Sequence, residues 1–309
     1  MRSLLVLLCD GLGDRAHPAH GGRTANEAAA TPALDALAAR GTTGLLWPLG
    51  PGRAPSSEIA HWAMLGYAPS EFPGRAVLEA RGHGLEPAPG DVVAYASLRS
   101  TTTRDGALWA TGRAGPEDAA DAQALLAAAS EVPSGPRGPF GPDAGDHVDP
   151  GAAAPRRRRS APGPGRPGPG AEVHLDLVPL LPGRGEGILV VRGPGAHDGV
   201  TDTDPFLRDR HPIMRPQPLV PAAEATAATA EAWSRAVHRA LAAHGRNAAR
   251  RAAGRAALDA VTLKWWGRPR PAPTLRARHG LDGVMIGGSP FLAGLAATTG
   301  MRFVRCAED

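Results

Sequence analysis

The sequence predicts an α/β protein in which an incomplete parallel-sheet core is interrupted by an inserted α+β domain. A strand, a helix and a second strand are expected in that order over residues 4–46, and the same order returns over residues 283–306. Between them lie longer helices and alternating runs that are typical of a separate domain. We therefore expect residues 1–85 to form the first part of the core, residues 86–270 the inserted domain, and residues 271–309 the return to the core.

The first strand is expected at residues 4–8, a continuous apolar run that is typical of a strand buried on both faces of a parallel sheet. Asp10 follows it, at the end of the strand beyond which ligands bind in such sheets. Thr31 is the expected N-cap of a helix that starts at Pro32, because threonine caps well and proline fits the first helical position. A second strand is expected at residues 43–46.

The same order of elements returns near the end of the sequence. Residues 283–287 are expected to form a buried strand, and Ser289 and Pro290 to start a helix that ends at Gly300. Residues 303–306 are expected to form the next strand. Because a parallel sheet that stopped here would leave an apolar edge bare, we expect the core to be incomplete.

The middle of the chain has a different pattern. Residues 91–103 alternate enough for a pair of strands, while residues 117–129 and 221–244 are expected to be helices. Residues 132–170 show no apolar periodicity and are rich in Pro, Gly and Arg, so we expect a disordered linker there. Two alternatives for this stretch are a patch at arginines 156–159 for nucleic acid or an acidic partner, and DNA that was read out of frame.

The composition excludes several classes of protein. Hydrophobic residues make up 42% of the 309 residues, which is enough for a sizeable core. The net charge is only +4, and the basic residues are arginines except for Lys264. Since Ala, Gly, Pro and Arg all have GC-rich codons, we attribute the arginines to base composition and expect no nucleic-acid partner. No stretch reaches the roughly 18 apolar residues of a membrane span, so no membrane partner is expected.

The two cysteines bear on whether the protein's compartment is reducing or oxidising. Cys9 and Cys306 each end a short apolar run, and we expect both to be buried thiols rather than a disulfide. The apolar run at residues 4–8 is too short for the core of a signal peptide. Together these features favour a cytoplasmic protein in a reducing environment.

Two short segments could carry chemistry. Asp10 is followed by glycines that allow a tight turn, an arrangement that is common for a metal ligand but also for an aspartate that only caps a turn. Ser57 would lie at the N-terminus of a short helix, where backbone N–H groups and the helix dipole favour a phosphoryl group. A serine at that position can equally be a simple helix cap.

A series of motifs gives these segments a context. The motifs are DGLGDR at 10–15, GGRT at 21–24, TPALDALA at 31–38, SEIAH at 57–61, LGY at 65–67, GRAVLEA at 74–80 and VTDTDP at 200–205. Their order and spacing resemble those of the archaeal-type 2,3-bisphosphoglycerate-independent phosphoglycerate mutases, which belong to the alkaline phosphatase superfamily. The resemblance covers nearly all of the chain outside residues 132–185.

The resemblance implies an alkaline-phosphatase-like core and a glycolytic isomerase of the cytoplasm that interconverts 2- and 3-phosphoglycerate through a phosphoserine. It implies that Ser57 is the nucleophile and also a metal ligand, and that Asp10 is a second metal ligand. Arg75, Asp202 and Asp204 match the substrate-binding side. Two divalent ions, manganese, magnesium or zinc, are expected as cofactors, and phosphoglycerate is the expected small-molecule partner.

The chain also departs from the family pattern. Glu58 and Ile59 stand where the family has Asp and Thr, and residues 76–77 are Ala-Val where it has Gly-Pro. The family's remaining metal ligands come from strands beyond the last residue of this chain, and after Gly283 the only carboxylates are those of residues 308 and 309. We therefore expect most of the metal ligands to be absent. The alternatives are a truncated, non-catalytic relic of the family and a metal-dependent phosphomonoesterase.

Overall fold

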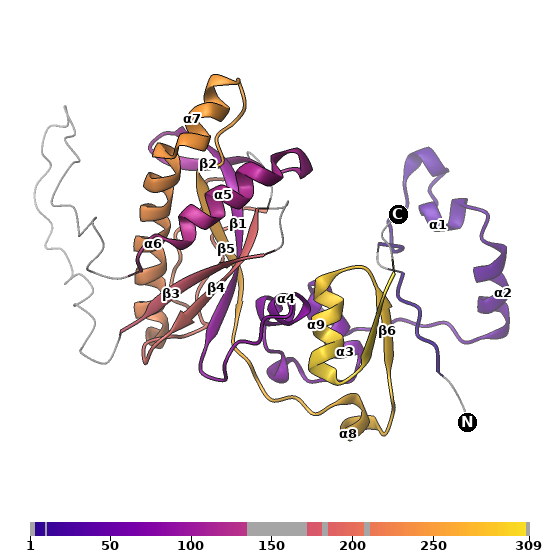
Figure 1. The fold of residues 1–309 in the computed structure, drawn as a ribbon. Helices are drawn as coiled ribbons and strands as arrows, with labels where there is room; N and C mark the ends of the chain where they lie inside the picture. The colour runs from indigo at the N-terminus through magenta and orange to yellow at the C-terminus, as the bar shows by residue number, and fades with distance from the viewer. Residues whose placement is uncertain (1–3, 10, 135–171, 181–184, 207–210, 307–309) are drawn as a thin grey trace, which may run out of the picture. The chain divides into compact units, whose positions relative to one another are not determined.

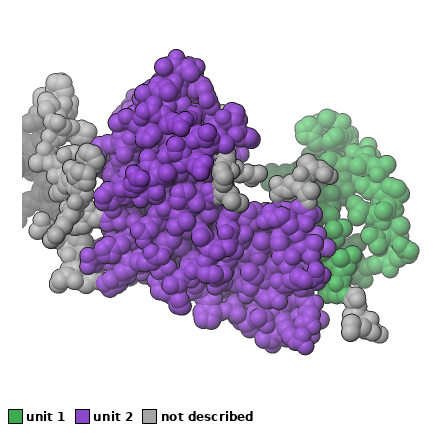
Figure 2. Space-filling view, in the orientation of Figure 1, with its two compact units in different colours: residues 1–54 green, residues 55–309 purple. Residues whose placement is uncertain are grey.

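The computed structural model describes residues 4–9, 11–134, 172–180, 185–206 and 211–306. The chain divides into two compact units, residues 1–54 and residues 55–309 (Figures 1 and 2). Asp10 and residues 135–171, most of the expected linker, lie outside the described residues.

In unit 1, residues 1–54, the regular elements of the described part are three short helices. They are η1 (Pro18–His20), α1 (Ala25–Ala28) and α2 (Pro32–Arg40). Thr31 is the N-cap residue of α2, as predicted, but its hydroxyl donates to the Asp35 carboxylate rather than capping the backbone. The prediction of strands at residues 4–8 and 43–46 is wrong, since both stretches are irregular and exposed. An apolar run becomes a buried strand only beside neighbouring strands, and the described residues of unit 1 contain none.

Unit 2, residues 55–309, is built around one long strand. Strand β1 (Val92–Arg104) pairs antiparallel with β2 (Ala107–Arg113), β4 (Glu186–Arg192) and β5 (Ala260–Gly267), and β3 (His174–Pro179) pairs with β4. The expected pair of strands at residues 91–103 is therefore a single strand. The hairpin turn to β2 comes later, at Asp105 and Gly106, which both have positive φ.

Helices cover both faces of this sheet. Along β1, Val92, Ala94, Ala96 and Leu98 pack into one apolar cluster with α5 (Ala119–Ser130) and α6 (Glu224–Ala243). The alternate residues Val93 and Tyr95 pack against α4 (Arg75–Gly82) on the other face. This period-2 division of one strand places α4 and the α5–α6 pair on opposite faces of the sheet. The apolar residues of α6 that recur every four positions, Trp233, Val237 and Leu241, are all buried.

Helix α4 also packs closely against α9 (Pro290–Thr299) through glycines. A Cβ atom at Gly294 would lie 1.7 Å from the carbonyl oxygen of Leu78, and one at Gly82 would lie 1.8 Å from that of Pro290. Only glycine therefore allows the two backbones to approach this closely. Helix α3 (Ser57–Met64) joins the assembly through Trp62, which is buried in a cluster with Leu78, Phe291 and Leu295.

The second βαβ unit has the predicted order. Strands β6 (Val284–Gly287) and β7 (Arg302–Arg305) pair in parallel and are connected by α9. Burial on both faces was predicted for β6, but the side chains of Val284 and Ile286 are exposed. Cys9 and Cys306 are exposed as well, so the prediction of buried thiols is wrong. Val284 and Ile286 lie on one face of β6, and no described residue of unit 2 buries that face.

Short elements complete the chain. They are η2 (Pro69–Glu71), η3 (Pro116–Asp118), η4 (Pro221–Ala223), α7 (Gly245–Ala252) and α8 (Leu275–His279). None of the helices in the described part of the chain has the length and apolar character needed to cross a membrane. The sheet of β1 to β5 lies within residues 86–270, and the boundaries at 85 and 270 stay a prediction.

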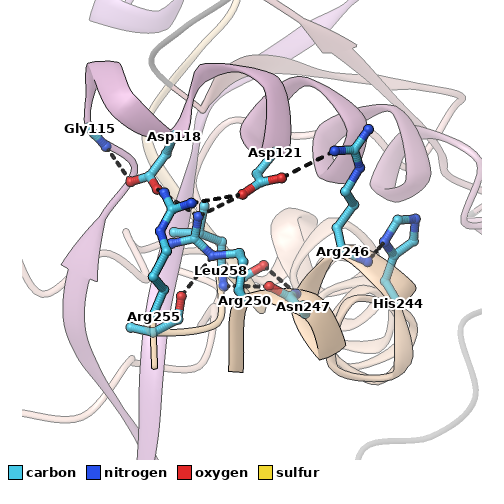
Figure 3. Close-up of polar contacts among 10 residues, drawn as sticks. Gly115, Asp118, Asp121, His244, Arg246, Asn247, Arg250, Arg255 and Leu258 are labelled. Atoms are coloured by element: carbon cyan, nitrogen blue, oxygen red, sulfur yellow. Dashed lines mark hydrogen bonds and ion pairs between the residues drawn. The ribbon is translucent and has the colours of Figure 1, made fainter. Parts of the chain in front are cut away.

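A buried ion-pair network ties α5 to α7 (Figure 3). Arg250 donates to Asp118 over 2.6 Å and to Asp121 over 3.0 Å, and Arg255 also pairs with Asp118. Beside it, the Asn247 amide bonds the backbone of Leu258 in both directions, at 2.8 and 2.9 Å. Because every charge in this network has an opposite partner, the network fixes the two helices without leaving a buried charge unpaired.

The glycine contact between α4 and α9 yields a stability prediction. Gly294→Ala should lower the free energy of unfolding by about 3 kcal/mol, because the added methyl group forces the two helices apart. Urea unfolding followed by circular dichroism measures the change.

The matched control is Gly90→Ala, since a Cβ atom at Gly90 would meet nothing within 4 Å. Its effect should stay within about 1 kcal/mol. Equal stability of the two variants would contradict the packing seen between α4 and α9.

Candidate functional site

A pocket of about 200 Å³ opens in unit 2 between α4 and the end of β5. Four segments meet there: the start of α3, the loop leading into α4, the loop after β4, and the end of β5 with the stretch that follows it. Its lining consists of Glu58, Phe72, Pro73, Gly74, Arg75, Asp198, Trp265, Trp266, Gly267 and Arg270. The lining therefore combines aromatic walls with two arginines and two carboxylates.

Two glycines make this junction possible. A Cβ atom at Gly74 would lie 2.6 Å from the Cα atom of Gly267, and one at Gly267 would lie 2.2 Å from the carbonyl oxygen of Pro73. Gly74 also has a φ of +97°, which other residues rarely adopt. The backbones of the two segments are thus in direct contact beneath the pocket.

Arg75 is held from several sides. Its Nε donates to Glu79 over 3.1 Å and its Nη1 to Glu58 over 3.4 Å. The guanidinium carbon lies 3.8 Å from the ring centre of Trp265 and 5.2 Å from that of Phe291. Burial raises the pKa of Glu79, although Arg75 opposes the shift. Arg75 therefore connects α3, α4, β5 and α9 at the pocket wall.

Trp265 forms that wall in an unusual backbone conformation. Its φ is +60°, in the left-handed region that bulky residues rarely occupy. It lies in a β-bulge, where β5 has one residue more than β1 between two paired positions. Its N–H donates to the Asp202 carboxylate over 2.8 Å, and burial raises the pKa of Asp202. The strained residue thus presents its indole ring to Arg75.

Asp204, two residues further on, is fully buried. It accepts hydrogen bonds from Arg99, from the Thr262 hydroxyl at 2.8 Å and from the Phe206 N–H at 2.7 Å. Burial alone would raise the pKa of Asp204, but Arg99 and Lys264 together lower it. Its carboxylate is therefore engaged within the protein on both oxygens.

Lys264 lies among aromatic rings beside this carboxylate. Its Nζ is 3.5 Å from Asp204, 4.3 Å from the ring centre of Trp265 and 5.5 Å from that of Tyr95. Burial lowers the pKa of the Lys264 amine, and the attraction of Asp204 offsets the shift only in part. The only lysine of the chain thus stands next to the pocket wall in a poorly hydrated place.

The structure relates three of the five predicted site residues to one another. Ser57 is the first residue of α3, exposed, and its neighbour Glu58 contacts Arg75. Arg75 stacks on Trp265, whose N–H is held by Asp202. Asp204 does not line the pocket; it lies in the interior, next to Arg99 and Lys264. Asp10, the fifth, lies outside the described residues.

The described residues do not fit a two-metal site. Among them, no group of three or more His, Cys, Asp or Glu side chains is placed to hold a metal ion. A pair of divalent ions needs several such ligands. No chemical step is therefore assigned to a metal within the part of the chain that the structure describes.

Of the residues that line the pocket, only Arg75 was predicted as a site residue; those not predicted include Asp198, Trp265, Trp266 and Arg270. The adjacent tryptophans directly after the only lysine were the one available signal. Aromatic residues make up only 4% of the chain, so two in succession are unusual here. Asp198 and Arg270 form an ion pair at 3.1 Å across distant parts of the sequence, which no local pattern indicates.

Comparisons with known proteins agree with the resemblance. Residues 38–137 match the family described as 2,3-bisphosphoglycerate-independent phosphoglycerate mutase. Proteins of that name from Methanopyrus kandleri and Pyrobaculum arsenaticum are 30% and 31% identical over 304 and 308 residues. Both alignments take in 97% of this chain, but only 63% and 64% of the relatives. The chain thus spans less than two thirds of the length of these curated relatives.

One solved structure shows the fold. The PH0037 protein of Pyrococcus horikoshii is 20% identical, with a TM-score of 0.59, and the match covers 96% of this chain and 59% of that one. The predicted α/β fold class is confirmed. Its parallel part is represented in the described residues by β6 and β7.

The surroundings of Lys264 yield a titration prediction. Its amine should titrate below the ordinary lysine value of about 10.4, because burial disfavours the charged form. Since the folded chain then binds this proton more weakly than the unfolded chain, the group's contribution to stability should rise as pH increases between the two pKa values.

Reductive methylation with ¹³C-formaldehyde reports this amine by NMR, and the chain has no other lysine to overlap it. Lys264→Arg assigns the signal by removing it. Titration in urea gives the unfolded reference, and an equal or higher value in the folded protein would contradict the burial of the amine.

Proposed function

The chain is a relative of the 2,3-bisphosphoglycerate-independent phosphoglycerate mutases along nearly its whole length, and we propose that it carries the substrate-holding part of such an enzyme. The activity proposed for the whole protein is interconversion of 2- and 3-phosphoglycerate in glycolysis, in the cytoplasm. The observation that carries the proposal is Arg75, which is fixed at the pocket wall and linked through Glu58 to the helix that begins with Ser57.

The pocket has chemistry suited to a small dianion. Phosphoglycerate carries a phosphate and a carboxylate, and the planar fork of arginine matches both groups. Arg75 and Arg270 line the pocket, and the start of α4 adds backbone N–H groups there. Stacking on Trp265 keeps the Arg75 guanidinium in one plane, which lowers the entropy lost when a ligand binds.

Ser57 is proposed as the phosphoryl acceptor. Its hydroxyl oxygen would lose its proton and attack phosphorus while the bond from phosphorus to the glycerate oxygen breaks, and that oxygen would take up a proton, which leaves phosphoserine and glycerate. The other glycerate hydroxyl would then take the phosphoryl group back. Ser57 is exposed at the N-terminus of α3, a position that favours the anionic phosphoserine.

The two divalent ions implied by the resemblance, with Asp10 and Ser57 among their ligands, belong to the same proposal. Their remaining ligands would have to lie outside the described residues. A non-catalytic relic would bind phosphoglycerate or nothing, without labelling Ser57. A phosphomonoesterase would label Ser57 and release inorganic phosphate instead of returning it to glycerate.

The pocket yields a binding prediction. Arg270→Ala should weaken binding of 3-phosphoglycerate about tenfold or more, because a charge-assisted hydrogen bond is worth roughly 1.5–3 kcal/mol. Titration calorimetry measures the affinity. The matched control is Arg276→Ala, an exposed arginine of α8 whose partner is Asp282. An Arg270→Ala variant that binds like the unaltered chain would exclude this pocket as the substrate site.

The nucleophile yields a separate prediction. After incubation with phosphoglycerate and manganese, any phosphoryl group that the chain carries should be on Ser57 and not on Ser56, because Ser57 has the family's spacing of four residues before His61. Phosphopeptide mapping by mass spectrometry measures it. Ser56→Ala should keep the label and Ser57→Ala should lose it. Label that remains in Ser57→Ala would exclude Ser57 as the nucleophile.

A further inference from the structure

We propose that Glu58 is a positioning residue that couples occupation of the Arg75 pocket to the placement of Ser57. The inference rests on the proposed function, since it takes the pocket as the substrate site and Ser57 as the acceptor. It concerns a contact that the family pattern does not supply, because Glu58 stands where that pattern has a shorter aspartate.

The first turn of α3 has few other attachments. Ser56 is its N-cap but makes no side-chain cap, and Ser57 makes no side-chain hydrogen bond within the described part of the chain. The end of the helix is anchored differently, because Trp62 is completely buried and the His61 ring lies 5.8 Å from Phe291. Within the described residues, the ion pair from Glu58 to Arg75 is the only polar side-chain link from this first turn to another element.

Arg75 can bind a ligand without releasing Glu58. Its Nε is used by Glu79 and its Nη1 by Glu58, while its Nη2 has no hydrogen-bond partner among the described residues. Because the guanidinium is planar and rigid, a ligand that draws Nη2 into the pocket also moves Nη1. The stack on Trp265 restricts that movement to the plane of the group. Glu58 follows Nη1, and Ser57 is the residue next to it.

The length of the side chain decides whether the link exists. The distance from the Glu58 carboxylate to Nη1 is 3.4 Å, near the upper limit for a hydrogen bond. Aspartate is shorter by one methylene, about 1.5 Å, and would leave the two groups out of contact. Glu58→Asp therefore keeps the negative charge next to Ser57 and removes only the link.

The test combines ligand binding with hydrogen exchange in the full chain. Saturating 3-phosphoglycerate should slow exchange of the amides of residues 60–63 about tenfold in the unaltered protein, because a fixed first turn opens less often. In Glu58→Asp, bound ligand should change these rates less than twofold. The matched control is Glu86→Asp, which shortens the ion-pair partner of Arg81 at the far end of α4, outside the pocket lining. It should retain the full effect.

Two further measurements distinguish the possible outcomes. Unaltered hydrogen exchange in α6 shows that a variant is folded. Binding of inorganic phosphate, as a second probe, shows whether the pocket takes an anion at all. Bound ligand that leaves α3 unprotected, or Glu58→Asp that keeps the protection, would overturn the role of Glu58 while leaving the pocket as a binding site. If neither 3-phosphoglycerate nor phosphate binds, the pocket is not an anion site, and both proposals are overturned. Coupling with no label on Ser57 would leave Glu58 as a positioning residue and overturn only the proposed function.

Discussion

Helix α4 must fit two neighbours at once, and the candidate site depends on that constraint. One side of the helix lies on the sheet through Ala76, Val77 and Ala80, where small side chains let it approach β1. The other side meets α9 at Gly82, where no side chain at all can be accommodated. A helix held from both sides cannot tilt without opening a cavity or creating a clash. The packing of α4 therefore fixes the position of its first residue, Arg75, at the pocket.

The electrostatics of the pocket follow from this placement. Arg75 lies beside two carboxylates, those of Glu58 and Glu79, and above an aromatic face, so its charge is compensated although it is largely buried. With Nε and Nη1 used by these carboxylates, Nη2 between them has no hydrogen-bond partner among the described residues and is available to a ligand. The same division recurs at Arg270, which pairs with Asp198 while lining the pocket. Both arginines are thus oriented before any ligand arrives, and less free energy is needed to order them on binding.

What could be predicted from the sequence depends on how local its cause is. Helices α2 and α9 were predicted with their starts, because proline at the first position and a capping side chain are local signals. The strands at residues 4–8 and 43–46 were not formed, because a strand requires partners that the run itself does not encode. For the site, the resemblance supplied Ser57, Arg75 and Asp202. The bulge at Trp265 and the ion pair between Asp198 and Arg270 result from contacts between distant segments, and no spacing indicated them.

The motif VTDTDP shows how one resemblance can conceal two different roles. Asp202 and Asp204 were assigned together to the substrate side, yet their surroundings differ. Asp204 accepts hydrogen bonds on both oxygens. It is the buried counter-ion of two cations, Arg99 and Lys264. Asp202 is only partly buried and uses Oδ1 to hold the backbone N–H of Trp265, so it shapes the pocket wall directly. Burial disfavours the charged form of Asp202. The carboxylate nevertheless stabilises the strained backbone of Trp265, whose ring stacks on Arg75. Asp204 therefore acts on the pocket through Lys264, whereas Asp202 acts through Trp265, and the two effects meet at the same indole ring.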